Sequence, residues 1–190
     1  GKSTLLRIIL GQEAPDIGSC TLGSRAVIGY LAQEAVPESN GHSVLRYFRE
    51  EAGHEEGEAR GQLARFLFFG SDVFKAITNL SGGEWTRLRF AILMHRRPNL
   101  LILDEPTNHL DIDSREALEE ALEEFPGTVL AVSHDRYFIN RLFHKIWTID
   151  KGRFGVFEGN YEYYKEKLAE KVVAASPLQE QKPQRTLTYR

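Results

Sequence analysis

With 190 residues, the chain is long enough for one substantial hydrophobic core, or for one domain with a small appended subdomain. Its net charge of −3 argues against a generally basic nucleic-acid-binding protein, so no direct DNA binding is expected. Cys20 is the only cysteine, which excludes an intrachain disulfide and a cysteine metal cluster and is compatible with the reducing cytoplasm. The longest apolar runs are too short to cross a bilayer, so no membrane insertion is expected.

The first ten residues predict a helix that starts beside a phosphate-binding turn. Residues 3–10 have helical spacing, and Gly11 is well placed to end the helix. GKST (residues 1–4) matches the second half of the loop G-x-x-x-x-G-K-[ST], in which amides at a helix N-terminus face phosphate oxygens. In that arrangement Lys2 reaches the β- and γ-phosphates, and Ser3 offers its hydroxyl to Mg²⁺. A surface helix that begins with a lysine and a serine is the alternative interpretation.

The middle of the chain changes from short apolar segments to amphipathic ones. Residues 20–33 (CTLGSRAVIGYLAQ) predict a hairpin or a pair of strands around Gly23-Ser24. Residues 42–97 predict a mainly helical region, because amphipathic segments alternate with breaks that contain glycine and asparagine. Within it, LSGGE (80–84) places a serine and two glycines before a helix, where exposed amides can hold a phosphate. A flexible N-cap is the alternative there.

From Pro98 onward the pattern is strand, helix, strand. NLLILDEP (99–106) is a continuous apolar run, which is typical of a strand buried on both faces. SREALEEALEEF (114–125) predicts a helix with glutamates opposite an apolar face made by Ala117, Leu118, Ala121, Leu122 and Phe125. GTVLAVSHD (127–135) predicts a second buried strand. Together they predict a βαβ crossover in a parallel sheet.

Two carboxylates, Asp104 and Glu105, end the first of these strands. At that place Asp104 can hold Mg²⁺ through a water molecule next to Ser3, and Glu105 can polarise the water that attacks a γ-phosphate. An acidic turn before Pro106 is the alternative, which the presence of GKST in the same chain disfavours.

The last part of the chain predicts a hairpin and then a polar tail. Residues 145–157 (KIWTIDKGRFGVF) predict two antiparallel strands that turn at Lys151-Gly152. Residues 174–190 are polar and contain prolines, so we expect a disordered tail there. The domain itself is expected to span residues 1–173, with a helical subdomain at about 42–97.

Five motifs follow each other in the order and at the spacing of the ABC ATPase family: GKST, YLAQ, LSGGE, LDEPTNHLD and SHD. The chain therefore resembles an ABC nucleotide-binding domain from Gly1 to about Lys167. The resemblance implies an α/β P-loop NTPase fold with a parallel sheet core and a helical signature subdomain, without the strands that precede the phosphate loop. It also implies ATP and Mg²⁺ as ligands.

The resemblance implies two groups of nucleotide-site residues. The first group surrounds the nucleotide of this domain: the Walker A remainder Gly1, Lys2, Ser3 and Thr4, the Q-loop residue Gln33, the Walker B residue Asp104, the catalytic Glu105 and the γ-phosphate-sensing His134. Of these, Ser3, Gln33 and Asp104 are implied as magnesium ligands. The second group comprises the signature residues Ser81, Gly82, Gly83 and Glu84, which would contact ATP held by an opposite domain, and the D-loop Leu110-Asp111.

Finer matches are similar to the ABC-F branch, namely DEPTNHLD, SHDRYF and GNYEYY. Members of this branch carry two ABC domains on one polypeptide, lack membrane domains and mostly act on ribosomes, as translation factors or as proteins that protect ribosomes against antibiotics. The resemblance thus implies a cytoplasmic ATPase with a second ABC domain and the ribosome as partners. The SREALEEAL helix and the lack of a long charged linker after residue 167 are more like the second domain of such a pair.

Two other functions share these motifs. The ATP-binding subunit of an ABC membrane transporter is the main alternative, although the ABC-F details disfavour it. An SMC-type DNA-maintenance ATPase is rejected, because a long coiled coil would separate GKST from the signature. The first glycines of the phosphate loop and the aromatic residue that stacks on adenine would lie before Gly1. We therefore expect a fragment that hydrolyses ATP negligibly on its own.

Overall fold

The computed structural model describes residues 1–32, 41–150 and 152–175. Its central sheet contains three parallel strands in the spatial order β1 (Ile28–Leu31), β2 (Leu100–Asp104) and β3 (Thr128–Val132). The Leu101, Ile102 and Leu103 side chains of the middle strand are fully buried. A strand with parallel neighbours on both sides is covered on both faces, which explains its continuous apolar run. The predicted α/β fold with a parallel core is confirmed.

The predicted hairpin or pair of strands around Gly23-Ser24 is wrong, because β1 is the one strand in the described residues 20–32 and pairs with β2. The pairing starts where the Val27 amide donates to the Asn99 side-chain oxygen at 2.8 Å, across a separation of 72 residues. Gly29 allows the close approach, since a Cβ there would lie 2.9 Å from Leu101 Cδ2. A partner so distant in sequence leaves no local pattern, and this explains the error.

The predicted strand in residues 127–135 is present as β3, but its burial was overestimated. Thr128 is exposed, and the other four residues of β3 are only half-buried. β3 is at the edge of the sheet, and no described strand pairs with its outer side. An edge strand has fewer neighbours than a central one, so its apolar side chains stay partly accessible.

Residues 42–97 are mainly helical, as predicted. They contain α2 (Val44–Ala52), α3 (Glu56–Arg65), the 3₁₀ turns η1 (Asp72–Phe74) and η2 (Ile77–Asn79), and α4 (Gly82–His95). Phe48, Leu88 and Phe90 of these helices are fully buried in the same core as β2. α4 also contacts β1 and α5, so these helices share a core with the sheet. That residues 42–97 form a separate subdomain stays a prediction.

Three further helices surround the strand ends. They are α1 (Lys2–Ile9), α5 (Ile112–Glu123) and α6 (Arg136–Leu142). On α5, Leu118 and Leu122 are buried, and Ala121 and Phe125 pack against the core, so the predicted apolar face is confirmed.

The C-terminal hairpin is also confirmed. It comprises β4 (Lys145–Asp150) and β5 (Arg153–Glu158), with Asp150 opposite Arg153, so the turn has two residues as predicted. Lys151 itself lies outside the described residues, and Gly152 has a φ of 75° that suits the turn. α7 (Tyr161–Ala175) follows and continues past the predicted domain boundary at 173, whereas residues 176–190 of the predicted tail lie outside the described residues.

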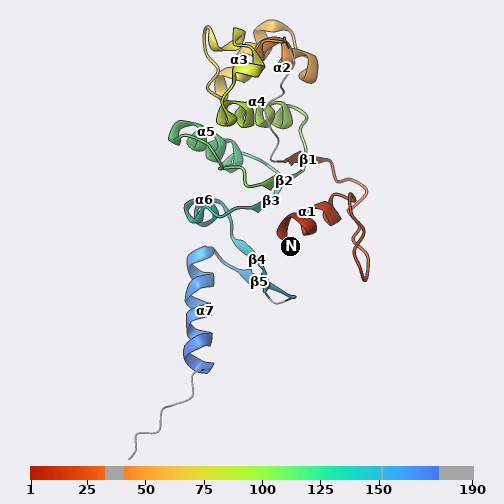
Figure 1. The fold of residues 1–190 in the computed structure, drawn as a ribbon, viewed down its shortest axis with the longest axis vertical. Coiled ribbons are helices and arrows are strands. Elements are labelled where there is room, and N and C mark those ends of the chain that lie inside the picture. Colours follow the sequence, from red (N-terminus) through yellow and green to blue (C-terminus); the bar gives the residue numbers. More distant parts are fainter. Residues whose placement is uncertain (33–40, 151, 176–190) are drawn as a thin grey trace, which may run out of the picture.

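Figure 1 shows the elements in layers along an elongated molecule. α2 and α3 form one end, α4 lies between them and the sheet, and the β4–β5 hairpin and α7 form the other end. α1 lies beside the strands, on the side of the molecule away from α5 and α6. This arrangement brings the start of α1 and the loops after β2 and β3 to one region.

Candidate nucleotide site

The start of α1 is free of side-chain capping. Gly1 is the N-cap residue and makes no side-chain cap, whereas the N-cap side chains of α2, α4, α5 and α6 all accept backbone amides. Gly1, Lys2 and Ser3 are exposed, and Thr4 is half-buried. Amides at a helix N-terminus without a capping side chain remain available as donors, and the helix dipole favours an anion there. The start of α1 therefore fits a phosphate group.

Lys2, His134 and Glu105 come together in space. Lys2 Nζ lies 3.2 Å from His134 Nε2. The His134 backbone amide donates to Glu105 Oε2 at 3.1 Å, and His134 Nε2 lies 3.4 Å from Glu105 Oε1. These residues come from α1, from the loop after β3 and from the end of β2. The structure thus brings together three residues that the sequence had singled out separately.

The turn after β2 holds the two carboxylates at the edge of the sheet. Asp104 is the last residue of β2 and is half-buried. Glu105 has a left-handed φ of 50°, which is uncommon for a residue other than glycine. Its amide donates to the Val132 carbonyl at 2.8 Å, so the turn is fixed against the end of β3. Unusual backbone geometry of this kind often occurs at functional sites.

Two of the three predicted magnesium ligands, Ser3 and Asp104, lie within the described residues. The Ser3 hydroxyl and the Asp104 carboxylate are oxygen groups of the kind that Mg²⁺ prefers as ligands. In the described part of the chain no hydrogen bond joins these two side chains, and a magnesium ion bound partly through water needs none. Gln33 lies outside the described residues.

The end of β1, just before Gln33, is tied to α4. Arg89 Nη1 donates to the Ala32 carbonyl at 2.7 Å, in a partly buried contact. The sequence motifs gave no role to Arg89, because it lies inside α4 and outside every motif. The contact connects the segment that leads to Gln33 with the helix that begins at the signature.

The signature residues form a capping box at the start of α4. The Ser81 hydroxyl accepts the Glu84 amide at 3.1 Å, and the Glu84 carboxylate accepts the Ser81 amide at 2.7 Å. Lys75 Nζ lies 2.8 Å from the same carboxylate. Burial alone would raise the pKa of Glu84, but the hydrogen bonds from Lys75 and Ser81 outweigh it and hold the pKa below its usual range. The start of α4 is thus an N-cap closed by reciprocal hydrogen bonds, and phosphate binding by its amides remains a prediction.

The signature packs against the loop that precedes α5. A Cβ on Gly83 would come within 2.9 Å of the His109 carbonyl oxygen, and one on Gly82 would lie 3.9 Å from His109 Cβ. The loop ends at Asp111, whose carboxylate accepts the Ser114 amide at 2.8 Å and caps α5. The predicted D-loop and signature of this chain are therefore neighbours, while Lys2, Glu105 and His134 form a second group.

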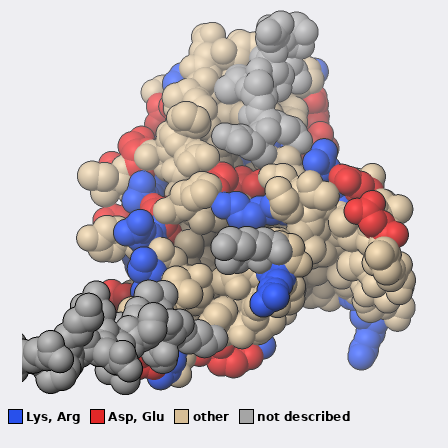
Figure 2. Space-filling view, turned by 60° about the horizontal axis from the view of Figure 1, so that its bottom comes forward, with Lys and Arg blue, Asp and Glu red and all other residues tan. Residues whose placement is uncertain are grey.

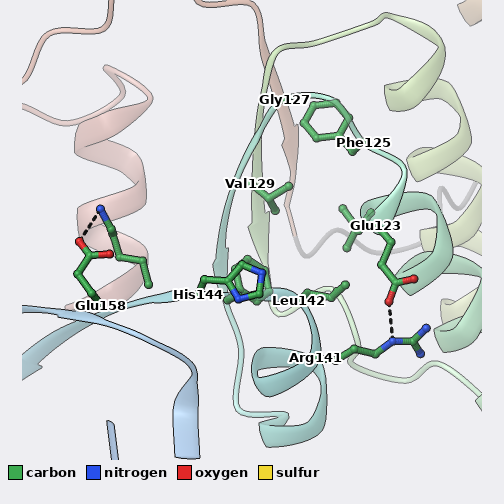
Figure 3. A pocket seen from close by; sticks show the side chains of 11 residues that line it. Glu123, Phe125, Gly127, Val129, Arg141, Leu142, His144 and Glu158 are labelled. Atoms are coloured by element: carbon green, nitrogen blue, oxygen red, sulfur yellow. Dashed lines mark hydrogen bonds and ion pairs between the residues drawn. The ribbon is translucent and has the colours of Figure 1, made fainter. Parts of the chain in front are cut away.

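One cavity of the described chain lies away from these residues. It has a volume of about 480 Å³ and lies between β3, the ends of α5 and α6, and the β4–β5 hairpin (Figure 3). Val129, Phe125 and Leu142 contribute apolar walls, and the ion pair between Lys145 and Glu158 (2.8 Å) lies at one side. None of the predicted site residues lines it, so we place the candidate site by its chemistry and not by cavity size.

The face of the molecule in Figure 2 is neither uniformly basic nor uniformly acidic, because Lys and Arg side chains are interspersed with Asp and Glu. None of the described helices combines the length and the apolar character needed to span a membrane.

Comparison with known proteins identifies the family of the chain. The ABC transporter family matches residues 1–108. The chain is 44% identical to the putative ATP-binding protein YdiF of Bacillus subtilis over 98% of its length, and 42% identical to the energy-dependent translational throttle protein EttA of Escherichia coli K12 over 87%. It is 42% identical to the ABC transporter F family member 5 of Arabidopsis thaliana over 88%. The chain spans only 29%, 31% and 25% of these relatives' lengths, respectively.

Solved structures show the same fold. A structure titled RNase-L Inhibitor aligns with a TM-score of 0.66 at 23% identity, over 90% of this chain and 35% of the other. A putative metal-chelate type ABC transporter in an inward-facing conformation aligns with a TM-score of 0.63 at 21% identity, over 83% of this chain and 68% of the other.

Proposed function

We propose that this chain, which belongs to the ABC transporter family, is an ATP-binding and ATP-hydrolysing domain of a longer ABC-F protein that acts on the ribosome. The observation that carries the ATPase assignment is the meeting of Lys2, His134 and Glu105 at the uncapped start of α1. The donors at this place suit phosphate oxygens, and the carboxylates of Asp104 and Glu105 suit a divalent cation and a water molecule.

Each residue has a distinct task in this proposal. Lys2 and the first amides of α1 bind the β- and γ-phosphates, and Ser3 and Asp104, with Gln33, hold Mg²⁺. The ion held by these residues would supply positive charge against the phosphate oxygens. Glu105 would orient and polarise the attacking water, and His134, in contact with Lys2, would bind the γ-phosphate.

The signature and the D-loop act on a second domain. Ser81, Gly82, Gly83 and Glu84 form one surface with Asp111, and this surface contacts ATP bound by another ABC domain in a head-to-tail pair. ATP closes the pair, and hydrolysis releases it. The 190-residue chain alone is accordingly expected to hydrolyse ATP negligibly, since hydrolysis needs the partner's signature.

The ribosome is the proposed target because the relatives include a translational throttle protein and because the motifs resemble the ABC-F branch. The finer role, in translation or in protecting ribosomes against antibiotics, belongs to the same proposal, as does a cytoplasmic location. The experiment is co-sedimentation of the whole protein, with Glu105→Gln to block hydrolysis, on ribosomes with and without Mg·ATP. We expect ATP-dependent co-sedimentation of the Glu105→Gln protein.

A protein that stays in the supernatant in both conditions would contradict the ribosomal role. Co-purification with a membrane permease instead would support the alternative, an ATP-binding subunit of a membrane transporter. Neither result would remove the ATPase assignment, which the binding of Mg·ATP tests separately.

A further inference from the structure

One face of α5 carries three charged residues that point to α6. Arg115, Glu119 and Glu123 are spaced four residues apart, so they lie in one row along the helix. Each of them forms an ion pair with Asp135 or Arg141, at the two ends of α6. Figure 3 shows one of these contacts, where Arg141 reaches across to Glu123. We call these five residues the α5–α6 ladder.

The first step of the ladder joins Arg115 to Asp135. Arg115 Nη1 lies 2.8 Å from Asp135 Oδ2, and the Asp135 side chain is only 14% exposed. The other oxygen, Asp135 Oδ1, accepts the amides of Tyr137 at 3.0 Å and Phe138 at 3.2 Å. A single carboxylate therefore caps α6 and binds the guanidinium of α5 at the same time. Removing Arg115 would leave a nearly buried carboxylate with only its amide donors.

The second step joins the far end of α6 to α5. Arg141 Nε lies 2.7 Å from Glu123 Oε1, and Arg141 Nη1 lies 2.5 Å from Glu119 Oε2. The hydrogen bond to Glu123 raises the pKa of Arg141 above its ordinary value. The Glu119 side chain is 8% exposed, so its charge is compensated mainly by Arg141. With both ends of α6 attached, α5 and α6 are held as one unit.

The two helices begin at different parts of the proposed ATPase site. α5 starts at Asp111, in the D-loop that would face the partner domain. α6 starts directly after His134, whose amide donates to Glu105. A displacement of α5 would therefore be carried through the ladder to the loop that holds His134.

Resting on the proposed function, we infer that Arg115 is a positioning residue, which acts through Asp135 to hold His134 against Glu105 and to couple it to the D-loop. It does not touch the nucleotide, so it influences the rate of hydrolysis and not the binding of ATP. A second ion pair, between Arg65 at the end of α3 and Glu124 at the end of α5 (2.9 Å), is exposed on both sides and leads to no site residue.

The test compares Arg115→Gln with the wild-type whole protein, and uses Arg65→Gln as the matched control. We expect the kcat for ATP to fall about 10-fold in Arg115→Gln with KM changed less than about 2-fold, because small displacements of catalytic groups are costly. Arg65→Gln should leave both constants unchanged. Asp135→Asn keeps the cap of α6 but loses the ion pair, so it should reproduce the effect, and the double variant Arg115→Gln/Asp135→Asn should lose no more than either single one.

Hydrogen exchange of residues 133–138 gives a readout that needs no hydrolysis. These amides should exchange about 10-fold faster in Arg115→Gln and Asp135→Asn than in the wild type or in Arg65→Gln. Unchanged exchange and turnover in Arg115→Gln, losses that add in the double variant, or an equal loss in Arg65→Gln would each overturn the inference. A wild-type protein that neither binds nor hydrolyses ATP, but whose exchange responds as expected, would contradict the proposed function alone.

Discussion

A substitution of His134 should affect catalysis without affecting stability. Its side chain is 79% exposed, and its contacts are with Lys2 and Glu105. We expect His134→Ala in the whole protein to lower ATP turnover about 100-fold, since it removes a group that assists proton transfer and charge stabilisation. The melting temperature should stay the same, because little buried surface is lost. Steady-state turnover and calorimetry check both, with His144→Ala, another exposed histidine, as the control.

An equal loss of turnover in His134→Ala and His144→Ala would contradict this role. The identity of His134 as a site residue could be predicted because it stands in register with four other motifs. Its contact with Lys2, 132 residues away, could not be predicted from spacing, since it depends on how the strands are ordered in the sheet.

The ion pairs of Arg115, Glu119 and Arg141, unlike the role of His134, could not be predicted from the sequence. Residues 114–125 were predicted as a helix with glutamates opposite an apolar face, and such a polar face is usually exposed to solvent. The structure buries Glu119 and pairs it with Arg141. The four-residue spacing of Arg115, Glu119 and Glu123 is visible in the sequence, but the partner helix is not.

At the scale of elements, the close packing of α4 on the loop before α5 gives a prediction about its two glycines. Gly83→Ala would place a Cβ 2.9 Å from the His109 carbonyl oxygen, so it should lower the free energy of unfolding by about 1–3 kcal/mol. Gly82→Ala has 3.9 Å to the nearest atom and should be neutral or slightly stabilising. Urea denaturation of the two variants measures the difference, and equal stabilities would refute the packing described here.

The start of α4 also predicts a pH dependence. The pKa of Glu84 is lowered from its ordinary value of 4.5, so its interactions stabilise the folded state above that value, and the stabilisation is lost as the pH falls below it. Glu84→Gln keeps the hydrogen bond to Ser81 but loses the charge that binds Lys75. It should cost about 0.5–1 kcal/mol at pH 7 and less near pH 3. Chemical denaturation at both pH values checks this, and a cost that is the same at pH 3 would contradict it.

Elements differ in how far their sequence determines them. β2, α5 and the β4–β5 hairpin were predicted correctly, since burial on two faces, a helical period and a two-residue turn are local patterns. The pairing of β1 and the half-exposed β3 were not, because both depend on which strands lie beside them. The end of α7 was also missed: the helix extends through Ala175, past the predicted domain boundary at residue 173, and the alanines near its end do not mark where a helix stops.

At the scale of the whole molecule, the hairpin leaves an apolar face uncovered. Trp147 and Val156 are opposite each other, as are Ile149 and Phe154, and all four are between 44% and 56% exposed. Such a patch favours association in water. We expect the 190-residue chain to self-associate with rising concentration, and Trp147→Lys/Val156→Lys to reduce the association. Sedimentation velocity measures it, and a monomer at all concentrations would contradict the expectation.

We propose that Lys2, Ser3, Asp104, Glu105 and His134 form one site for Mg·ATP. The most direct measurement is a crystal structure of the whole protein carrying Glu105→Gln, grown with ATP and Mn²⁺ in place of Mg²⁺, with the manganese located by its anomalous signal. The account predicts a manganese peak beside the Ser3 hydroxyl and Asp104, with the γ-phosphate next to Lys2 and His134. A nucleotide and metal bound away from the start of α1 would contradict it.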